Sequence, residues 1–158
     1  MSEPSPFFEF SVHVLKSSTA DQAWSLLLDA MKTKGFDRLL YVSTRSFSLD
    51  EPVINENALV LTNHHQEMVD VFVGEELYRQ TPTSAWGKTR QQVVSWRTIE
   101  DKFSSNDLNP AQIKMRDLSR RLGVLTGYTI SLESPDQSSR AVIGLCARAG
   151  LDQDAVDE

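Results

Sequence analysis

The chain has 158 residues, 40% of them hydrophobic and 24% charged, which is typical of one globular domain and excludes a disordered segment. Its formal net charge is −6, and its lone cysteine, Cys146, excludes an intrachain disulfide. A domain that binds nucleic acid by itself usually carries a basic face, and no basic cluster here exceeds Arg120-Arg121, so we expect no direct DNA contact.

The N-terminal part of the chain predicts an irregular start followed by a helix. In residues 1–18, Phe8, Phe10 and Val12 alternate with polar residues, which favours a partly extended segment. Thr19 and Gln22 form a capping box, and apolar residues then recur at helical spacing. We therefore predict a helix over 20–34, which Gly35 can end.

Two strands follow, at 36–47 and 58–62, and their order predicts a hairpin with a long loop. In the first strand Leu40 and Val42 share one face, whereas Leu39 and Tyr41 share the other. The two faces of this strand should therefore meet different neighbours.

The next segment carries two helix starts. Asn63 is expected to cap a helix with Met68 and Phe72 on its apolar face, and Thr81 caps another with Pro82 in its first position. The remaining predicted elements are a strand at 93–96, a polar loop at 101–109, a helix from Asn109-Pro110 to Gly123, and a hairpin of strands at 127–132 and 140–147.

This order predicts an α+β fold, in which hairpins build an antiparallel sheet and the helices gather against it. We expect residues 1–18 to form an N-terminal segment and residues 19–150 the main domain. Residues 151–158 begin with an Asp cap and acidic residues, which are signals of a helix start. We therefore expect them to be the beginning of a truncated helix or a tail.

Five segments occur in an order that resembles the sensor domain of LuxR-type quorum-sensing regulators: GFDRLLYVS, LTNHHQEMVDVF, TPTSA, VVSW and RRLGVLTGYTISL. The resemblance covers about residues 20–150. It implies an α-β-α sandwich around an antiparallel sheet of about five strands, which encloses an acyl-homoserine lactone between sheet and helices. It also implies a cytoplasmic transcription factor that forms a homodimer and contacts DNA only through a helix-turn-helix domain absent from this chain.

The same resemblance places five residues around the ligand, several of them altered, and a sixth is expected to join them. The family's tyrosine for the acyl carbonyl falls at His64, its lactone-binding tryptophan at Met68, a second tyrosine at Phe72 and its amide-binding aspartate at Thr81. Trp96 matches the family's aromatic wall, and Tyr41 is expected to add apolar surface.

These replacements remove hydrogen-bonding groups. Met68 has no donor for a lactone carbonyl, and a buried carbonyl left unpaired costs about 1–3 kcal/mol. Thr81 can accept a hydrogen bond but without the charge that roughly doubles its strength. We therefore expect an altered pocket that prefers a less polar or differently shaped signal molecule.

Other chemistries have weaker support. His64, His65 and Glu67 do not have the spacing of a helical zinc motif, because adjacent residues do not share a helix face. Cys146 lies within a strand, where a buried, unreactive thiol is expected. No nucleophile elbow or phosphate loop occurs, so we expect no enzyme, no metal and no cofactor.

Two other functions stay open. The chain could be a ligand-free interaction module that dimerises with related regulators and inhibits them, or a sensor of the PAS/GAF type. The N-terminus lacks the features of a signal peptide, and no apolar stretch approaches the roughly 20 residues of a membrane helix. We therefore expect a cytoplasmic protein with no membrane partner.

Overall fold

A computed structural model describes residues 5–44, 54, 58–80, 92–134 and 138–158. Its helices are α1 (Pro6–Leu15), α2 (Ala20–Thr33), α3 (Gln66–Val69), α5 (Arg97–Phe103), α6 (Pro110–Leu122) and α7 (Gln153–Asp157), with a π-helical turn η1 (Asp70–Gly74) and a 3-10 turn η2 (Leu77–Gln80). Its strands are β1 (Phe36–Thr44), β2 (Leu59–Thr62), β3 (Gln92–Ser95), β4 (Gly127–Glu133) and β5 (Arg140–Ala147).

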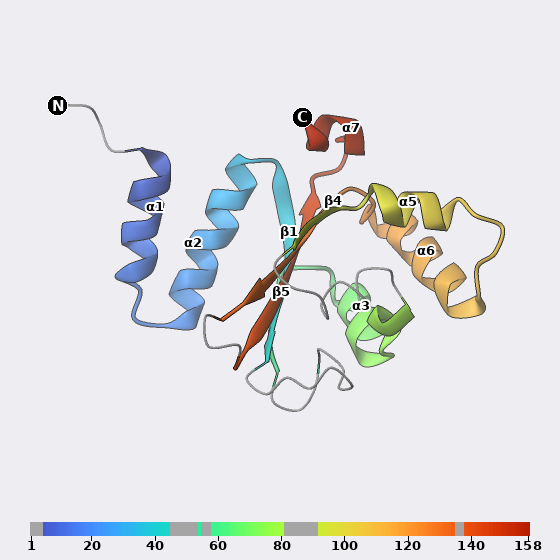
Figure 1. The fold of residues 1–158 in the computed structure, drawn as a ribbon, viewed down its shortest axis with the longest axis horizontal. Helices are drawn as coiled ribbons and strands as arrows, with labels where there is room; N and C mark the ends of the chain where they lie inside the picture. Colours follow the sequence, from blue (N-terminus) through green and yellow to red (C-terminus); the bar gives the residue numbers. More distant parts are fainter. Residues whose placement is uncertain (1–4, 45–53, 55–57, 81–91, 135–137) are drawn as a thin grey trace.

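The five strands form one sheet in the order β2-β1-β5-β4-β3, and every neighbouring pair is antiparallel. Figure 1 shows this sheet nearly edge-on, with α1 and α2 on one side and α3, α5 and α6 on the other. The predicted α-β-α sandwich is therefore confirmed. None of the described helices is both long and apolar enough to cross a membrane.

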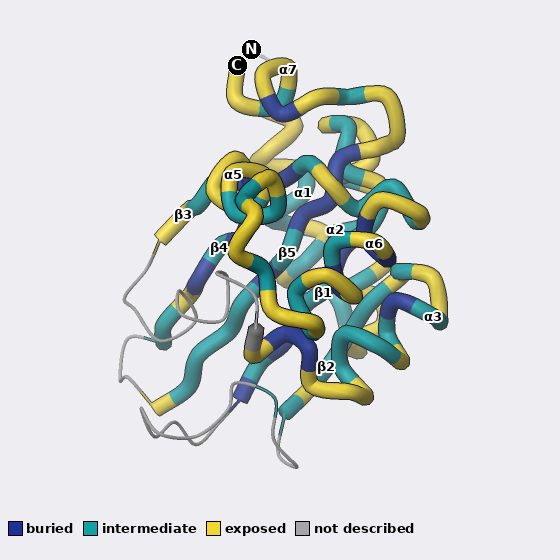
Figure 2. Tube along the Cα trace, turned by 90° about the vertical axis from the view of Figure 1, so that its right-hand side faces the viewer, coloured by how far each residue is buried: buried dark blue, intermediate teal, exposed yellow. Residues whose placement is uncertain are grey.

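The sheet has an apolar core on each face. Under α2, Leu39, Ile143 and Leu145 form a buried cluster with partly buried side chains of that helix. On the other face, Met68, Leu77, Met115 and Leu118 form a second buried cluster between α3, η2 and α6. Figure 2 shows buried residues along the central strands, whereas α1 contains none.

The N-terminal segment is a helix, so the prediction of an extended start was wrong. Ser5 caps α1 by accepting a hydrogen bond from the backbone N–H of Phe8 at 3.2 Å, and Pro6 occupies a first-turn position. This is the cap-then-proline start that was recognised at Asn109-Pro110. The prediction gave more weight to the alternation of phenylalanines with polar residues than to the Ser5-Pro6 helix start.

The crossing from β2 into α3 also differs from the prediction. His65, not Asn63, caps α3, because its Nδ1 accepts from the N–H of Glu67 at 3.2 Å. The side chain of Asn63 instead accepts from the N–H of Leu39 at 2.7 Å and donates to the carbonyl of Asp37 at 2.8 Å. Asn63 thus extends the pairing of β2 with β1 by one residue and fixes where the chain leaves the sheet.

Most remaining elements agree with prediction, with one exception. The helices at 20–33 and 110–122 and the β4–β5 hairpin are confirmed, and Asp152 caps a short C-terminal helix. Residues 101–103, however, belong to α5 rather than to a polar loop. Residues 45–47 and the expected helix start at Thr81-Pro82 lie outside the described residues.

Candidate ligand-binding cavity

A cavity of about 780 Å³ lies between the sheet and the helices α3, α5 and α6. This volume is within the range of sites that enclose small organic ligands. Its floor is the sheet face of Leu40, Val42, Val142, Gly144 and Thr129. Its other described walls come from the region of α3 to η2, from α5, from the second half of α6 and from residues 148–154.

Four of the six predicted site residues line this cavity: His64, Met68, Phe72 and Trp96. Met68 and Phe72 are four residues apart on the continuous helical segment α3–η1, so their side chains project from the same face. The fifth, Thr81, lies outside the described residues.

Tyr41 does not line the cavity, so its predicted place was wrong. It is partly buried against the cluster of Leu39, Ile143 and Leu145, on the α2 side of the sheet. Successive side chains of a strand point to opposite faces, so Tyr41 cannot share the face of Leu40 and Val42. The alternation within residues 36–47 already contained this information, and the assignment of Tyr41 to the pocket disregarded it.

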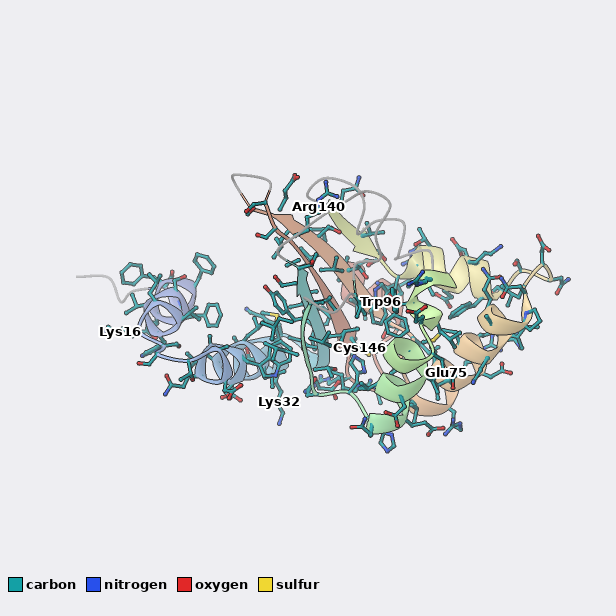
Figure 3. All side chains as sticks on the ribbon, turned by 90° about the horizontal axis from the view of Figure 1, so that it is seen from below. Lys16, Lys32, Glu75, Trp96, Arg140 and Cys146 are labelled. Atoms are coloured by element: carbon teal, nitrogen blue, oxygen red, sulfur yellow. The ribbon has the colours of Figure 1, made fainter. Side chains whose placement is uncertain are left out.

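Trp96 forms the aromatic part of the cavity wall where β3 ends and α5 begins. Its indole Nε1–H donates to the hydroxyl oxygen of Thr129 at 2.8 Å, and only 9% of the residue is exposed. Gly144 on β5 lies beneath the ring, since a Cβ there would be 3.7 Å from the indole. Figure 3 shows Trp96 between the sheet and the helices around α3. The ring therefore lies against the sheet with its own N–H already bonded.

The α3 end of the cavity is apolar and aromatic. Met68 is 5% exposed, and the ring of Phe72 meets that of Tyr78 edge-on, with centroids 6.1 Å apart. The Tyr78 hydroxyl donates to the carbonyl of Ile54 at 3.2 Å. Sequence reasoning missed both Tyr78 and Thr129 as lining residues. Their contacts join positions 24 and 33 apart in the chain, so no local spacing reveals them.

His64 is the only histidine of the described lining, and it lies directly before α3. Burial, and secondarily the positive charge of Arg38, lowers the pKa of His64 from 6.5 to about 4. The imidazole is therefore neutral at pH 7. Its neighbour His65 is exposed and caps α3, whereas His64 lines the cavity. Among the described residues, no group of three potential ligands could hold a metal ion.

Arg38 fixes the helical layer to the sheet beside His64. Its guanidinium donates to the carbonyls of Leu122 at 2.8 Å, Gly123 at 2.9 Å and Ala147 at 3.0 Å. The first two belong to the C-terminal end of α6, where carbonyls lack partners within the helix and a positive charge is favourable. One side chain of β1 thus positions the helix that carries Met115 and Ser119 into the cavity.

The C-terminal segment closes another side of the cavity and is held by side-chain hydrogen bonds. The Gln153 amide is 4% exposed and bonds both the N–H of Gly127 at 2.9 Å and its carbonyl at 3.1 Å. The Asp157 carboxylate accepts from Tyr128 at 2.7 Å, Ser95 at 3.0 Å and Arg97 at 3.0 Å. These bonds hold the pKa of Asp157 well below its usual value, the Tyr128 bond most of all.

Cys146 offers no nucleophile to the cavity. It is fully buried, and burial raises the pKa of its thiol to about 11, so that the unreactive protonated form prevails at neutral pH.

Comparison with known protein families gives one match over most of the chain. The model of the autoinducer binding domain family matches residues 19–158. A search of curated proteins gave no match.

Solved structures of two bacterial regulators share the fold. The N-acylhomoserine lactone-dependent LuxR family transcription factor CepR2 from Burkholderia cenocepacia superposes with a TM-score of 0.68 at 15% identity, covering 95% of this chain and 81% of its own. SdiA from Escherichia coli gives 0.67 at 13% identity, covering 92% of this chain. SdiA in complex with octanoyl-rac-glycerol gives 0.66 at 14% identity, covering 96% of this chain. The chain spans 58% of the length of both SdiA chains.

Proposed function

The chain belongs to the autoinducer-binding domain family of LuxR-type regulators, and from this premise we propose that it binds a small amphipathic signal molecule in the cavity between its sheet and its helices. The observation that carries the proposal is that four residues chosen from the sequence, His64, Met68, Phe72 and Trp96, come together around one cavity of ligand size.

The chemistry of these side chains favours a ligand other than an ordinary acyl-homoserine lactone. Met68 has no donor, and Phe72 has no hydroxyl. The Trp96 N–H already bonds Thr129, so a ligand carbonyl would have to compete for it. Among the described residues, the α3 end therefore offers mainly apolar surface for an acyl chain, with the neutral His64 and the hydroxyls of Thr62 and Tyr78 as its polar groups.

Ligand binding would stabilise the fold by mass action. At about 100 times its dissociation constant, a ligand that binds only the folded state adds about 2.7 kcal/mol. For a domain of this size the melting temperature then rises by about 5–10 °C. In the intact protein this free energy would be available to shift a homodimer equilibrium, and any DNA contact would belong to a helix-turn-helix domain outside this chain.

Thermal melting with N-octanoyl homoserine lactone and with octanoyl-rac-glycerol tests the proposal, because two of the similar structures name these kinds of ligand. We expect a shift with at least one of them that is lost in Phe72→Ala. Leu27→Ala is the matched control, since it also removes a core side chain but lies on the α2 side of the sheet. Absence of any shift, or loss of the shift in both variants alike, would speak against the cavity as the binding site.

A further inference from the structure

The cavity has two chemically different ends. The charged residues among its described lining all belong to α5, the last turn of α6 or the segment 148–154: Arg97, Glu100, Arg120, Arg148, Asp152 and Asp154. Figure 1 shows α5 and α7 beside the upper end of the sheet and α3 lower down. At the α3 end, none of the described lining residues carries a formal charge, since His64 is neutral at pH 7.

Some of these charges are already committed within the protein. Arg97 bonds Asp154 at 2.6 Å and Asp157 at 3.0 Å, and the Asp152 carboxylate accepts from the N–H of Ala155. The side chains of Glu100, Arg120 and Arg148 make no hydrogen bond or ion pair with any described residue. All three residues are exposed, so this end of the cavity opens to solvent and presents two cationic donors and one anionic acceptor that a ligand can use.

The walls that hold these groups are fixed in place. Gln153 bonds the start of β4 through both atoms of its amide, and Asp157 joins α7 to β3, β4 and α5. The hydroxyl of Thr126 adds a bond to the carbonyl of Leu151 at 3.1 Å. A ligand group at this end would meet partners whose backbone is held before binding, which lowers the entropy lost on association.

We infer that the ligand lies with its polar head at the α5–α7 end of the cavity and its acyl tail against Met68 and Phe72. The head is uncharged and carries several hydroxyl or ester oxygens. This inference rests on the proposed function and adds orientation and head-group class to it.

The class of the head follows from the balance of charges. The lining at this end has three guanidinium groups and three carboxylates, so a head with net charge would meet like charges as well as opposite ones. A hydroxyl group both donates and accepts, and can therefore bond Glu100 and an arginine together. Hydrogen bonds to charged partners are the stronger kind.

Calorimetric titration tests both the orientation of the ligand and the class of its head group. The two ligands, octanoyl-rac-glycerol and octanoate, have tails of equal length. We expect the glycerol ester to bind at least about tenfold more tightly than octanoate. Arg120→Gln, Arg148→Gln and Glu100→Gln should each weaken binding of the ester by about three- to tenfold. Arg116→Gln is the matched control: it removes the same charge from α6, where Arg116 pairs with Asp117 and does not line the cavity.

The outcomes separate the inference from the function on which it rests. Ester binding that is unaffected by the three α5–α7 variants but weakened by His64→Gln would place the head at the α3 end and overturn the orientation alone. Tighter binding of octanoate would overturn the head-group class. Failure of both ligands to bind, together with no melting shift from the lactone, would overturn the proposed function as well.

Discussion

The indole N–H of Trp96 and the hydroxyl of Thr129 satisfy each other inside the cavity wall, at 2.8 Å. Thr129→Val keeps the shape of the side chain and removes the acceptor, which leaves a buried N–H without a partner. We expect the free energy of unfolding to fall by about 1–3 kcal/mol, measured by urea denaturation.

Two further variants show whether loss of this hydrogen bond causes the fall in the free energy of unfolding. Thr129→Ser retains the hydroxyl and should keep most of the stability. In a Trp96→Phe background, where no N–H is left unpaired, Thr129→Val should have a smaller effect. Equal losses in both backgrounds would mean that the bond contributes nothing.

His64 should make the stability of the fold depend on pH. The pKa of its imidazole is about 4 in the folded state and 6.5 as the ordinary value, so the unfolded chain binds the proton more readily. Stability is therefore retained above about pH 6.5 and is lost as the pH falls toward 4. Between pH 7 and pH 5 we expect His64 to account for about 2 kcal/mol of that loss.

Comparison of variants isolates this contribution from the many carboxylates that titrate at lower pH. Denaturant unfolding of His64→Gln should show a shallower decline between pH 7 and pH 5 than the unchanged chain. His13→Gln, on the exposed face of α1, should decline like the unchanged chain. Parallel pH curves for His64→Gln and the unchanged chain would contradict the burial of a neutral histidine.

The sequence was sufficient for site residues that depend on local periodicity and insufficient for those that depend on tertiary contacts. Met68 and Phe72 share a helix face by spacing alone, and both line the cavity. Tyr41 was assigned against the period of its own strand, and the structure places it on the other face. Tyr78 and Thr129 gave no signal, because each acquires its role from a partner far away in the chain.

The C-terminal end of α6 depends on one side chain from β1. Arg38 bonds three backbone carbonyls there and at the end of β5, and Arg38→Met would remove these three bonds while retaining a long apolar stem. We expect a loss of about 2–4 kcal/mol in the free energy of unfolding. Arg116→Met on α6 is the control, because Arg116 is partly buried like Arg38 but bonds only the neighbouring Asp117, and it should change stability by about 0.5 kcal/mol at most. Similar losses in both variants would contradict a special role for Arg38.

The helix α7 is short and contributes no side chain to either buried apolar cluster, so its position should depend on the Asp157 carboxylate. Asp157→Asn removes the negative charge that Arg97 pairs with and weakens the bonds from Tyr128 and Ser95. We expect faster amide hydrogen exchange over residues 150–157 with no change in α2 or β1. Glu158→Gln removes an adjacent charge and should leave exchange unchanged. Unaltered amide hydrogen exchange in Asp157→Asn would show that other contacts hold α7 in place.

The elements that sequence reasoning missed have a common physical reason. In α1 the Ser5-Pro6 start competed with an alternation that also fits a strand. In α5 a short apolar pair, Ile99 and Phe103, was outweighed by its polar neighbours. Asn63 has the chemistry of a cap, but the neighbouring strand β1 offers it two backbone partners. Local propensity is weak where tertiary contacts are available.

The three layers together explain why a cavity exists at all. On the α2 side the side chains of helix and sheet meet directly in a buried cluster. On the other side α3, α5 and α6 meet the sheet at its ends and edges, through Arg38, through Trp96 and through the C-terminal segment. A space of about 780 Å³ remains between these supports. We therefore expect an amphiphile to occupy this space and not the face of the sheet that α2 covers.

Indole N–H resonances of the chain, followed by NMR during titration with octanoyl-rac-glycerol, test that claim most directly. Trp96 lines the cavity, whereas Trp24 is packed into the cluster on the α2 side of the sheet and serves as an internal control. We expect a saturable shift of the Trp96 signal while the Trp24 signal stays in place. A Trp96 signal that does not move, or a shift confined to Trp24, would contradict it.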